Sequence, residues 1–129
     1  MAAEPPKPTD AELEILTALW SIGAGTVRDI HAVINRRRPA EYSTLLKFMQ
    51  IMTEKGLVRV DQTERANVYE PAKPREWTQR QLAGDLLQRV FNGSAKGLFV
   101  GALSARKTSK KELAELRKLL DDYQEGGTK

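Results

Sequence analysis

The chain of 129 residues suits one compact domain, or a small domain with an oligomerisation arm, and its net charge of +4 hints only mildly at a polyanionic partner. It has no cysteine and a single histidine, His31, which disfavours catalysis, metal binding and cofactor chemistry. No apolar stretch approaches the roughly 18 to 20 residues that span a bilayer, and the N-terminus lacks a signal-peptide core, so we expect a soluble cytoplasmic protein without membrane insertion.

The N-terminal part of the chain predicts a lead-in followed by two capped helices. Residues 1–8 contain three prolines and show no periodicity, so we expect them to be disordered. Thr9 stands three residues before Glu12, which is the spacing of a capping box, and apolar residues at helical spacing follow. Thr26 and Asp29 repeat this spacing, and the helix that they open must end before the next proline.

A third helix and a hairpin are predicted next. The helix opens near Ser43, and Gly56 is well placed as the left-handed residue that closes it. Its apolar residues gather on one face and its polar residues on the opposite face. The β-prone segments 57–61 and 68–70 flank the polar stretch 62–67, which is the pattern of a β-hairpin.

The last third of the chain is predicted to be helical. A helix over residues 77–91 is interrupted at 92–94, and a short apolar segment follows at 98–103. Ser109 and Glu112 have the spacing of a capping box for a final helix. The apolar residues recur at spacings of three and four, as in a coiled-coil seam. Either these helices fold back on the N-terminal part as a cap, or they pair with a second chain.

The order of three helices and a hairpin is the layout of a winged helix-turn-helix. The predicted fold class is therefore mainly α with a small β-hairpin wing, and with a C-terminal helical dimerisation region. The predicted divisions are a disordered lead-in at 1–8, a winged-helix DNA-binding domain at 9–73, the dimerisation region at 74–125 and a tail at 126–129.

A symmetric homodimer is the arrangement that we expect for the C-terminal helices. A dimer gives the apolar seam a partner, and it places two reading units on two DNA half-sites. The residues expected at the dimer interface are Leu82, Leu86, Leu87, Val90, Phe91, Leu98, Phe99, Leu103, Leu113, Leu116, Leu120 and Tyr123.

The predicted third helix carries the candidate DNA-reading residues, because in winged helices this helix lies in the major groove. Ser43, Lys47 and Gln50 form its outward polar stripe; glutamine can pair with adenine, and lysine can donate to guanine. Leu46 flanks the stripe, and it either contacts a thymine methyl group or extends the core. The expected DNA-contacting residues are Ser43, Thr44, Leu46, Lys47, Gln50, Arg36, Arg37, Arg38 and Arg65.

Local placement of charge supports this assignment better than net charge does. Residues 1–75 hold eleven Lys or Arg against ten Asp or Glu, so this part is nearly neutral. The arginines at 36–38 and Arg65 at the hairpin tip are expected to hold phosphates; the alternatives are a solvated helix end and a free surface charge. Near-neutrality leaves open a winged helix that binds protein without sequence-specific DNA binding. The salt dependence of DNA binding separates these two functions.

Short motifs spread over residues 9–123 resemble one family of bacterial repressors. They are AELEIL at 11–16 followed by Trp20, YSTL at 42–45, EKGLV at 54–58, VY at 68–69, and ELAEL at 112–116 before LL at 119–120. In this order and spacing they resemble the penicillinase and methicillin-resistance repressors, whose wider family includes copper-responsive repressors. The resemblance implies a dimer joined by its C-terminal helices, which represses transcription by binding an inverted-repeat operator in double-stranded promoter DNA.

The resemblance also implies induction by proteolysis, in which a membrane sensor with a metalloprotease domain leads to cleavage in the dimerisation region. The chain departs from the family there, because Gly101 and Ala102 stand where the best-known relatives have the cleaved Asn-Phe bond. It departs again in the third helix, at Leu46, Lys47 and Ile51, where relatives often carry Arg, Thr and Arg. Direct copper or zinc sensing is disfavoured, since suitable ligands are missing.

Overall fold

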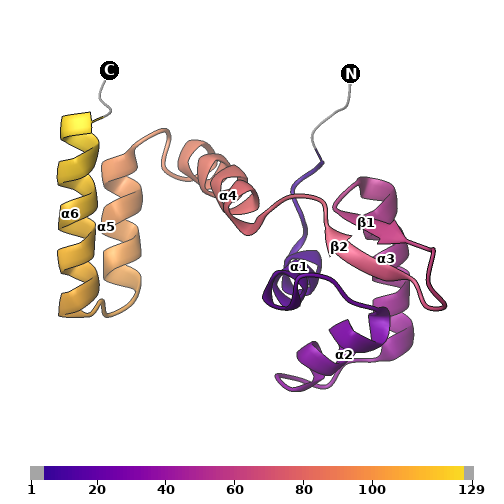
Figure 1. Cartoon of the computed structure of the whole chain (residues 1–129). Coiled ribbons are helices and arrows are strands. Elements are labelled where there is room, and N and C mark those ends of the chain that lie inside the picture. Colours follow the sequence, from indigo (N-terminus) through magenta and orange to yellow (C-terminus); the bar gives the residue numbers. More distant parts are fainter. Residues whose placement is uncertain (1–4, 127–129) are drawn as a thin grey trace. The chain divides into compact units, whose positions relative to one another are not determined.

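The computed structural model describes residues 5–126, and within that range it contains helices and one two-stranded sheet (Figure 1). The order confirms the predicted fold class, with three helices before a hairpin and helices after it. The chain divides into an N-terminal unit, which ends at Gly84, and a C-terminal unit, which begins at Asp85. The elements are α1 (Asp10–Ile22), α2 (Val27–Asn35), α3 (Tyr42–Lys55), β1 (Val58–Asp61), β2 (Val68–Pro71), α4 (Arg75–Arg89), α5 (Ala95–Ala105) and α6 (Lys110–Gly126).

The ends of the first three helices follow the predicted local signals. The Thr9 hydroxyl accepts from the Glu12 amide at 3.2 Å, and the Glu12 carboxylate accepts from the Thr9 amide at 2.9 Å. Thr26 and Asp29 make the same reciprocal pair at the start of α2, at 3.1 and 3.0 Å. Gly56 closes α3 with φ 81°, a conformation that costs glycine little. The boxes predicted at Thr9 and Thr26 and this C-cap are confirmed. At the start of α6, the predicted bond from the Glu112 amide to the Ser109 hydroxyl is present at 3.0 Å.

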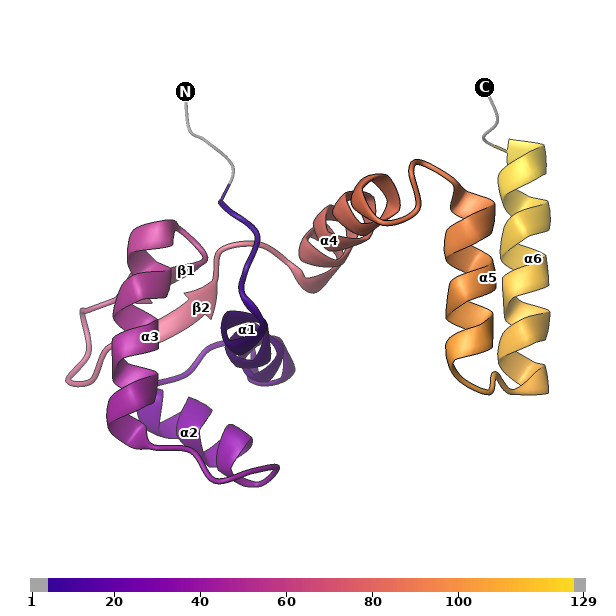
Figure 2. The ribbon, with the colours of Figure 1, turned by 180° about the vertical axis from the view of Figure 1, so that it is seen from behind.

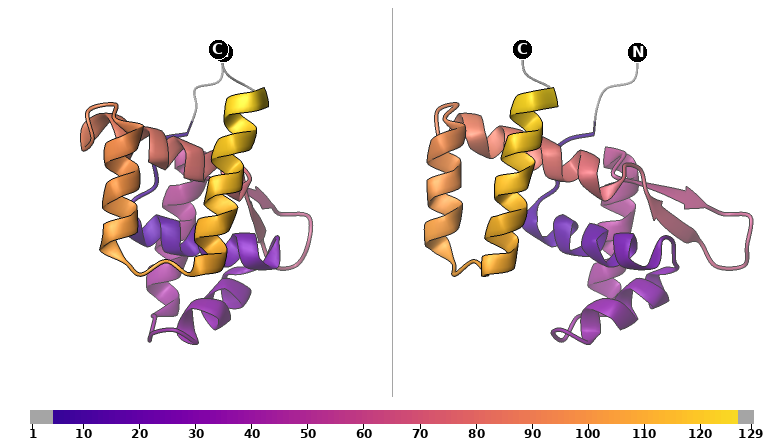
Figure 3. Two further views of the ribbon diagram at one scale, coloured as in Figure 1. Left: turned by 90° about the vertical axis from the view of Figure 1, so that its left-hand side faces the viewer. Right: turned by 60° about the vertical axis from the view of Figure 1, so that its left-hand side comes forward.

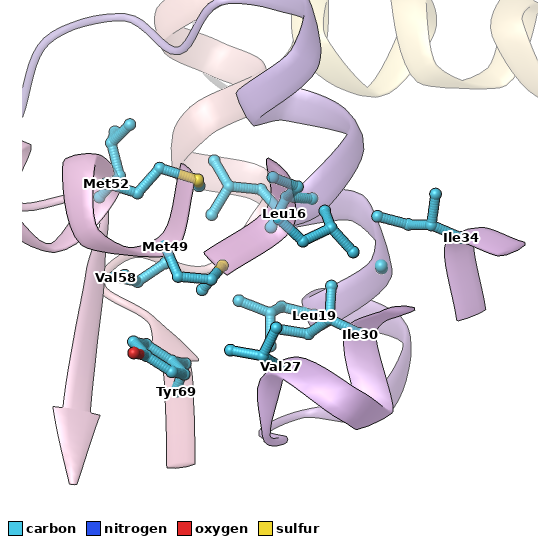
Figure 4. Close-up of a cluster of buried hydrophobic side chains, with 13 residues drawn as sticks. Leu16, Leu19, Val27, Ile30, Ile34, Met49, Met52, Val58 and Tyr69 are labelled. Carbon is cyan, nitrogen blue, oxygen red and sulfur yellow. The ribbon is translucent and has the colours of Figure 1, made fainter. Parts of the chain in front are cut away.

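A single hydrophobic core holds the N-terminal unit together (Figure 4). Leu19 of α1, Ile30 of α2 and Met49 and Met52 of α3 are 0% exposed, and Tyr69 of β2 closes the cluster. One charged side chain is buried beside it: Glu12, whose carboxylate accepts from Lys55 Nζ at 2.7 Å. This core fixes α3 against both preceding helices, so the position and orientation of the outer face of α3 are defined.

The hairpin is antiparallel, with Val58 opposite Pro71 and Asp61 opposite Val68. The loop between α1 and α2 adds to it, because Gly25 and Tyr69 exchange two backbone hydrogen bonds of 2.9 and 2.8 Å. A Cβ at Gly25 would lie 2.8 Å from Ile22 Cδ1 and 3.0 Å from Asp29 Cβ, so these side chains would have to shift to admit a larger residue. The tip of the hairpin extends beyond the neighbouring helices (Figure 3).

The first two thirds of α4, as far as Gly84, belong to the N-terminal unit. The Trp20 indole N–H donates to the Lys73 carbonyl at 3.1 Å, and the Arg75 guanidinium lies over the Trp20 ring, 5.8 Å from its centroid. Thr78 is buried, and Gln81 donates to the Pro5 carbonyl at 3.2 Å. The segment after the wing is therefore fixed to α1.

The C-terminal unit is built around α5 and α6, which run in opposite directions and are joined by a short loop (Figure 2). No described residue of these two helices is buried. The predicted break before α5 is confirmed, because Asn92 and Gly93 have φ values of 52° and 84°. The apolar segment 98–103 lies inside α5, which begins after Ser94, whose hydroxyl accepts from the Gly97 amide at 2.9 Å.

Candidate nucleic-acid interface

The helix α3 has one face in the core and the opposite face open to solvent. Leu45, Met49 and Met52 are buried, and every residue of the predicted DNA-reading stripe is exposed. The exposed set on this face is Ser43, Thr44, Leu46, Lys47 and Gln50. The structure thus brings these predicted contacts together on a single rigid element.

Leu46 does not extend the core, because 40% of its surface is exposed. Tyr42, one turn earlier, is 47% exposed, and Ile51 is 44% exposed further along the helix. Exposed apolar side chains beside a polar stripe suit contact with sugars and with thymine methyl groups. Of the two alternatives for Leu46, the structure agrees with the exposed one.

A hollow of about 590 Å³ lies beside Leu46 and is lined by three elements of the N-terminal unit. The start of α2 contributes Arg28, α3 contributes Tyr42 and Leu46, and the hairpin contributes Arg65. The sequence interpretation included Arg65 and missed Arg28. Its position in the sequence could have indicated this placement, since Arg28 is a charged residue in the first turn of a helix that packs beside the reading helix.

The arginines at 36–38 do not behave alike. Arg38 binds the Glu14 carboxylate, with Nε 3.1 Å from Oε2, and it also donates to the Pro39 carbonyl at 3.2 Å. The hydrogen bond from Arg38 lowers the pKa of Glu14, and Glu14 in turn raises the pKa of Arg38. The charge of Arg37 also acts on Glu14, and Arg36 is exposed.

Several basic side chains of this unit remain available for a polyanion. In the part of the chain that the structure describes, Arg28, Arg36, Lys47 and Arg65 are exposed and form no ion pair. Unpaired arginine and lysine side chains are the usual phosphate ligands of DNA-binding proteins. The unit is nearly neutral overall, yet Lys47 is exposed on α3, and Arg28 and Arg65 line the hollow beside Leu46.

The family model described as Penicillinase repressor matches residues 8–122 of the chain. The chain belongs to the penicillinase repressor family. It is also similar to the transcriptional regulator BlaI of two strains of Mycobacterium tuberculosis, CDC 1551 / Oshkosh and ATCC 25618 / H37Rv. In each case it is 29% identical over 88 residues, which make up 67% of this chain and 64% of the relative. The chain therefore spans less than two thirds of the length of these curated relatives.

In this member of the penicillinase repressor family, none of the twelve predicted interface residues is buried. Phe99, Leu103 and Leu116 line a groove of about 460 Å³ between α5 and α6. The exposed members are Leu86, Val90, Phe99, Leu103, Leu120 and Tyr123, and the half-buried members are Leu82, Leu87, Phe91, Leu98, Leu113 and Leu116.

The predicted cleavage position of this penicillinase repressor family member lies inside a helix. Gly101 and Ala102 belong to α5, and Gly101 packs against Phe91 so closely that an added Cβ would lie 3.3 Å from the Phe91 ring. Over residues 5–126, no helix has the length and apolar character needed to cross a membrane. The same residues contain no group of three or more metal-ligating side chains.

Proposed function

We propose that this protein is a transcriptional repressor that acts as a homodimer in the cytoplasm and binds double-stranded DNA. The observation that carries the proposal is the division of α3. Leu45 and Met49 anchor it in the core, and Ser43 and Lys47 are exposed on the other side. In a winged helix such an exposed face enters the major groove. Membership of a family of repressors supports the same role.

The proposed contacts divide into base and backbone contacts. Lys47 donates to guanine, Gln50 pairs with adenine, and Leu46 packs on a thymine methyl group. Arg36 and the hairpin residue Arg65 bind phosphates on either side of the reading helix. The base contacts provide specificity, and the phosphate contacts provide most of the salt-dependent affinity.

The C-terminal unit supplies the proposed dimer interface. Apolar residues of α5 and α6 stay exposed in a single chain, with Val100 at 56% and Leu119 at 60%. Apolar side chains gathered around an open groove favour association with a second copy. A two-fold dimer would present two copies of α3 to the two half-sites of an inverted-repeat operator.

We further propose that repression is relieved through this unit. Separation of the two reading units would lower the effective concentration of the second unit on DNA, without altering any DNA contact. A membrane sensor metalloprotease is the inducer that the family resemblance suggests. Because Gly101 and Ala102 are helical in α5, a protease would have to unwind this helix before it could cleave there. Mass spectrometry of the repressor under inducing conditions tests this step, and an intact chain would refute it.

Titration with DNA from the promoter of the protein's own gene, over a series of salt concentrations, tests the DNA-binding proposal. A protein with several phosphate contacts loses affinity steeply as salt rises, with a logarithmic slope of about −0.9 for each phosphate. Absence of binding at low salt would overturn the proposal. That result would favour the alternative, a winged helix that binds another protein.

Lys47→Ala separates base contact from phosphate contact. If Lys47 donates to guanine, the variant should lose about tenfold more affinity for the promoter duplex than for an unrelated duplex. Arg80→Ala, which removes another exposed charge of the same unit, serves as the control. Equal losses of Lys47→Ala on both duplexes would show that Lys47 contacts phosphate alone.

A further inference from the structure

The loop between α2 and α3 is held from two sides at one residue, Ala40. His31 Nε2 lies 2.7 Å from the Ala40 carbonyl oxygen, and the Ala40 amide donates to Asn35 Oδ1 at 3.2 Å. A carbonyl oxygen can only accept, so the Nε2 atom of His31 carries the hydrogen of this bond. Both partners belong to α2, and together they form what we call the Ala40 clamp.

The first turn of α3 has few other anchors. Residues 41–44 are all exposed, and Leu45 is the first buried residue of the helix. Glu41 at the N-cap makes no side-chain bond to the helix amides, whereas α1 and α2 begin with complete capping boxes. The position of this turn therefore depends on the chain that enters it, and Ala40 is where that chain is fixed.

His31 also contacts the first residue of α3 directly. Its ring meets the ring of Tyr42 edge-on, with centroids 6.0 Å apart and planes at 69°. This half-buried side chain of α2 thus bonds the loop and packs against the beginning of the reading helix. No other histidine is present in the chain to share this role.

We propose that His31 and Asn35 are positioning residues for sequence recognition, which fix the start of α3 so that Ser43 and its neighbours meet the base edges. The inference rests on the proposed function of α3 as the DNA-reading helix. Hydrogen bonds to bases require defined geometry and distinguish sequences, whereas phosphate contacts carry no sequence information. Loss of the Ala40 clamp therefore weakens the discrimination between sequences more than it weakens DNA binding as such.

The test uses the full-length chain, a consensus duplex selected from a random-sequence pool, and an unrelated duplex of equal length. The measured quantity is the ratio of the two affinities. His31→Leu, which removes the donor and keeps a side chain of comparable bulk, should lower this ratio about tenfold. His31→Gln retains an N–H donor and should restore the ratio to within about twofold of wild type. Ala32→Gln, at an exposed site of α2, is the matched control.

Asn35→Ala gives an independent test, because Asn35 is exposed and its replacement leaves the core intact. It should lower the ratio in the same direction as His31→Leu. Thermal unfolding of each variant is followed by circular dichroism. Equal losses of affinity on both duplexes, together with a lower Tm, would show that the Ala40 clamp contributes only to stability. That result would overturn the inference.

The failure of this inference can be told apart from the failure of the proposed function. Wild-type protein that does not distinguish any selected duplex from unrelated DNA would refute the reading role of α3, and the inference would fall with it. Wild-type discrimination that persists unchanged in His31→Leu and in Asn35→Ala would overturn the positioning role alone.

Discussion

The two units of this chain differ in how far their large apolar side chains are buried. In the N-terminal unit Leu19 and Ile30 are 0% exposed, whereas in the C-terminal unit Leu120 is 55% and Tyr123 is 80% exposed. Full burial of a large aliphatic side chain contributes about 1.5–3 kcal/mol to stability. The first unit obtains this contribution within one chain. The second leaves most of it unrealised, and in our proposal a second copy of the chain supplies the missing surface.

Leu19→Ala should have the largest effect on this comparison. It empties a fully buried site and is expected to lower the free energy of unfolding by about 2–5 kcal/mol at any protein concentration. Leu120→Ala, the matched change in the C-terminal unit, should cost less as the protein is diluted and the dimer dissociates. Chemical denaturation at several concentrations measures both. A Leu120→Ala cost that is large and independent of concentration would contradict the contrast between the units.

Leu116→Asp should disrupt the proposed dimer. Leu116 lines the groove between α5 and α6, and a carboxylate there would have to be desolvated in the interface. We expect monomers in sedimentation analysis and a loss of promoter affinity of about 100-fold, because the avidity of two linked reading units is lost. Lys111→Asp, at an exposed position near the start of α6, is the control. A dimer that persists in Leu116→Asp would refute this interface.

Local signals in the sequence predicted most of the N-terminal unit. Helix caps depend on residues three positions apart, so Thr9 with Glu12 and Thr26 with Asp29 could be identified without any tertiary information. The outward face of α3 likewise follows from helical periodicity. The bonds between Gly25 and Tyr69 could not be found in this way, since 44 residues separate the partners and backbone pairing leaves little trace in side-chain patterns.

The candidate site was predictable in its centre and less so at its edges. The polar stripe of α3 needed only a helical wheel, and the structure exposes all of it. The pairing of Arg38 with Glu14 links α1 to the loop before α3. The sequence shows only three consecutive arginines, so it does not reveal that Arg38 is the one paired in this way. Arg28 joins the site only because α2 places it beside the hairpin.

Glu12→Gln tests the ion pair between the buried carboxylate of Glu12 and the half-buried Lys55. Burial raises the pKa of Glu12, but hydrogen bonds from Lys55 and Thr9 and the charge of Lys55 lower it by more, so the pKa lies below its ordinary value of 4.5. The stability from this carboxylate is therefore fully present above pH 4.5 and is lost as pH falls through the lowered pKa. Glutamine can still serve in the capping box, so the variant isolates the charge.

We expect Glu12→Gln to lower the free energy of unfolding by about 1–3 kcal/mol at neutral pH, and the difference from wild type to shrink in acid. Glu14→Gln, which breaks the exposed pair with Arg38, is the control and should cost only about 0.2–1 kcal/mol. Urea titrations at neutral and acidic pH give both values. A wild-type advantage that is constant over this range would show that the charge of Glu12 is not its source.

Gly84→Ala should have the smallest effect, and it concerns the place where the two units meet in sequence. Gly84 lies inside α4 without a positive φ, and an added Cβ would have no atom within 4 Å. Glycine in a helix interior costs about 0.5–1 kcal/mol relative to alanine, so the variant should be more stable by that amount in urea denaturation. Gly101→Ala in α5 is the comparison, because its Cβ would lie 3.3 Å from the Phe91 ring and crowding should offset the helical gain. Equal stabilisation of both variants would mean that the Phe91 ring can move away without an energetic penalty. Gly101 would then serve no packing role.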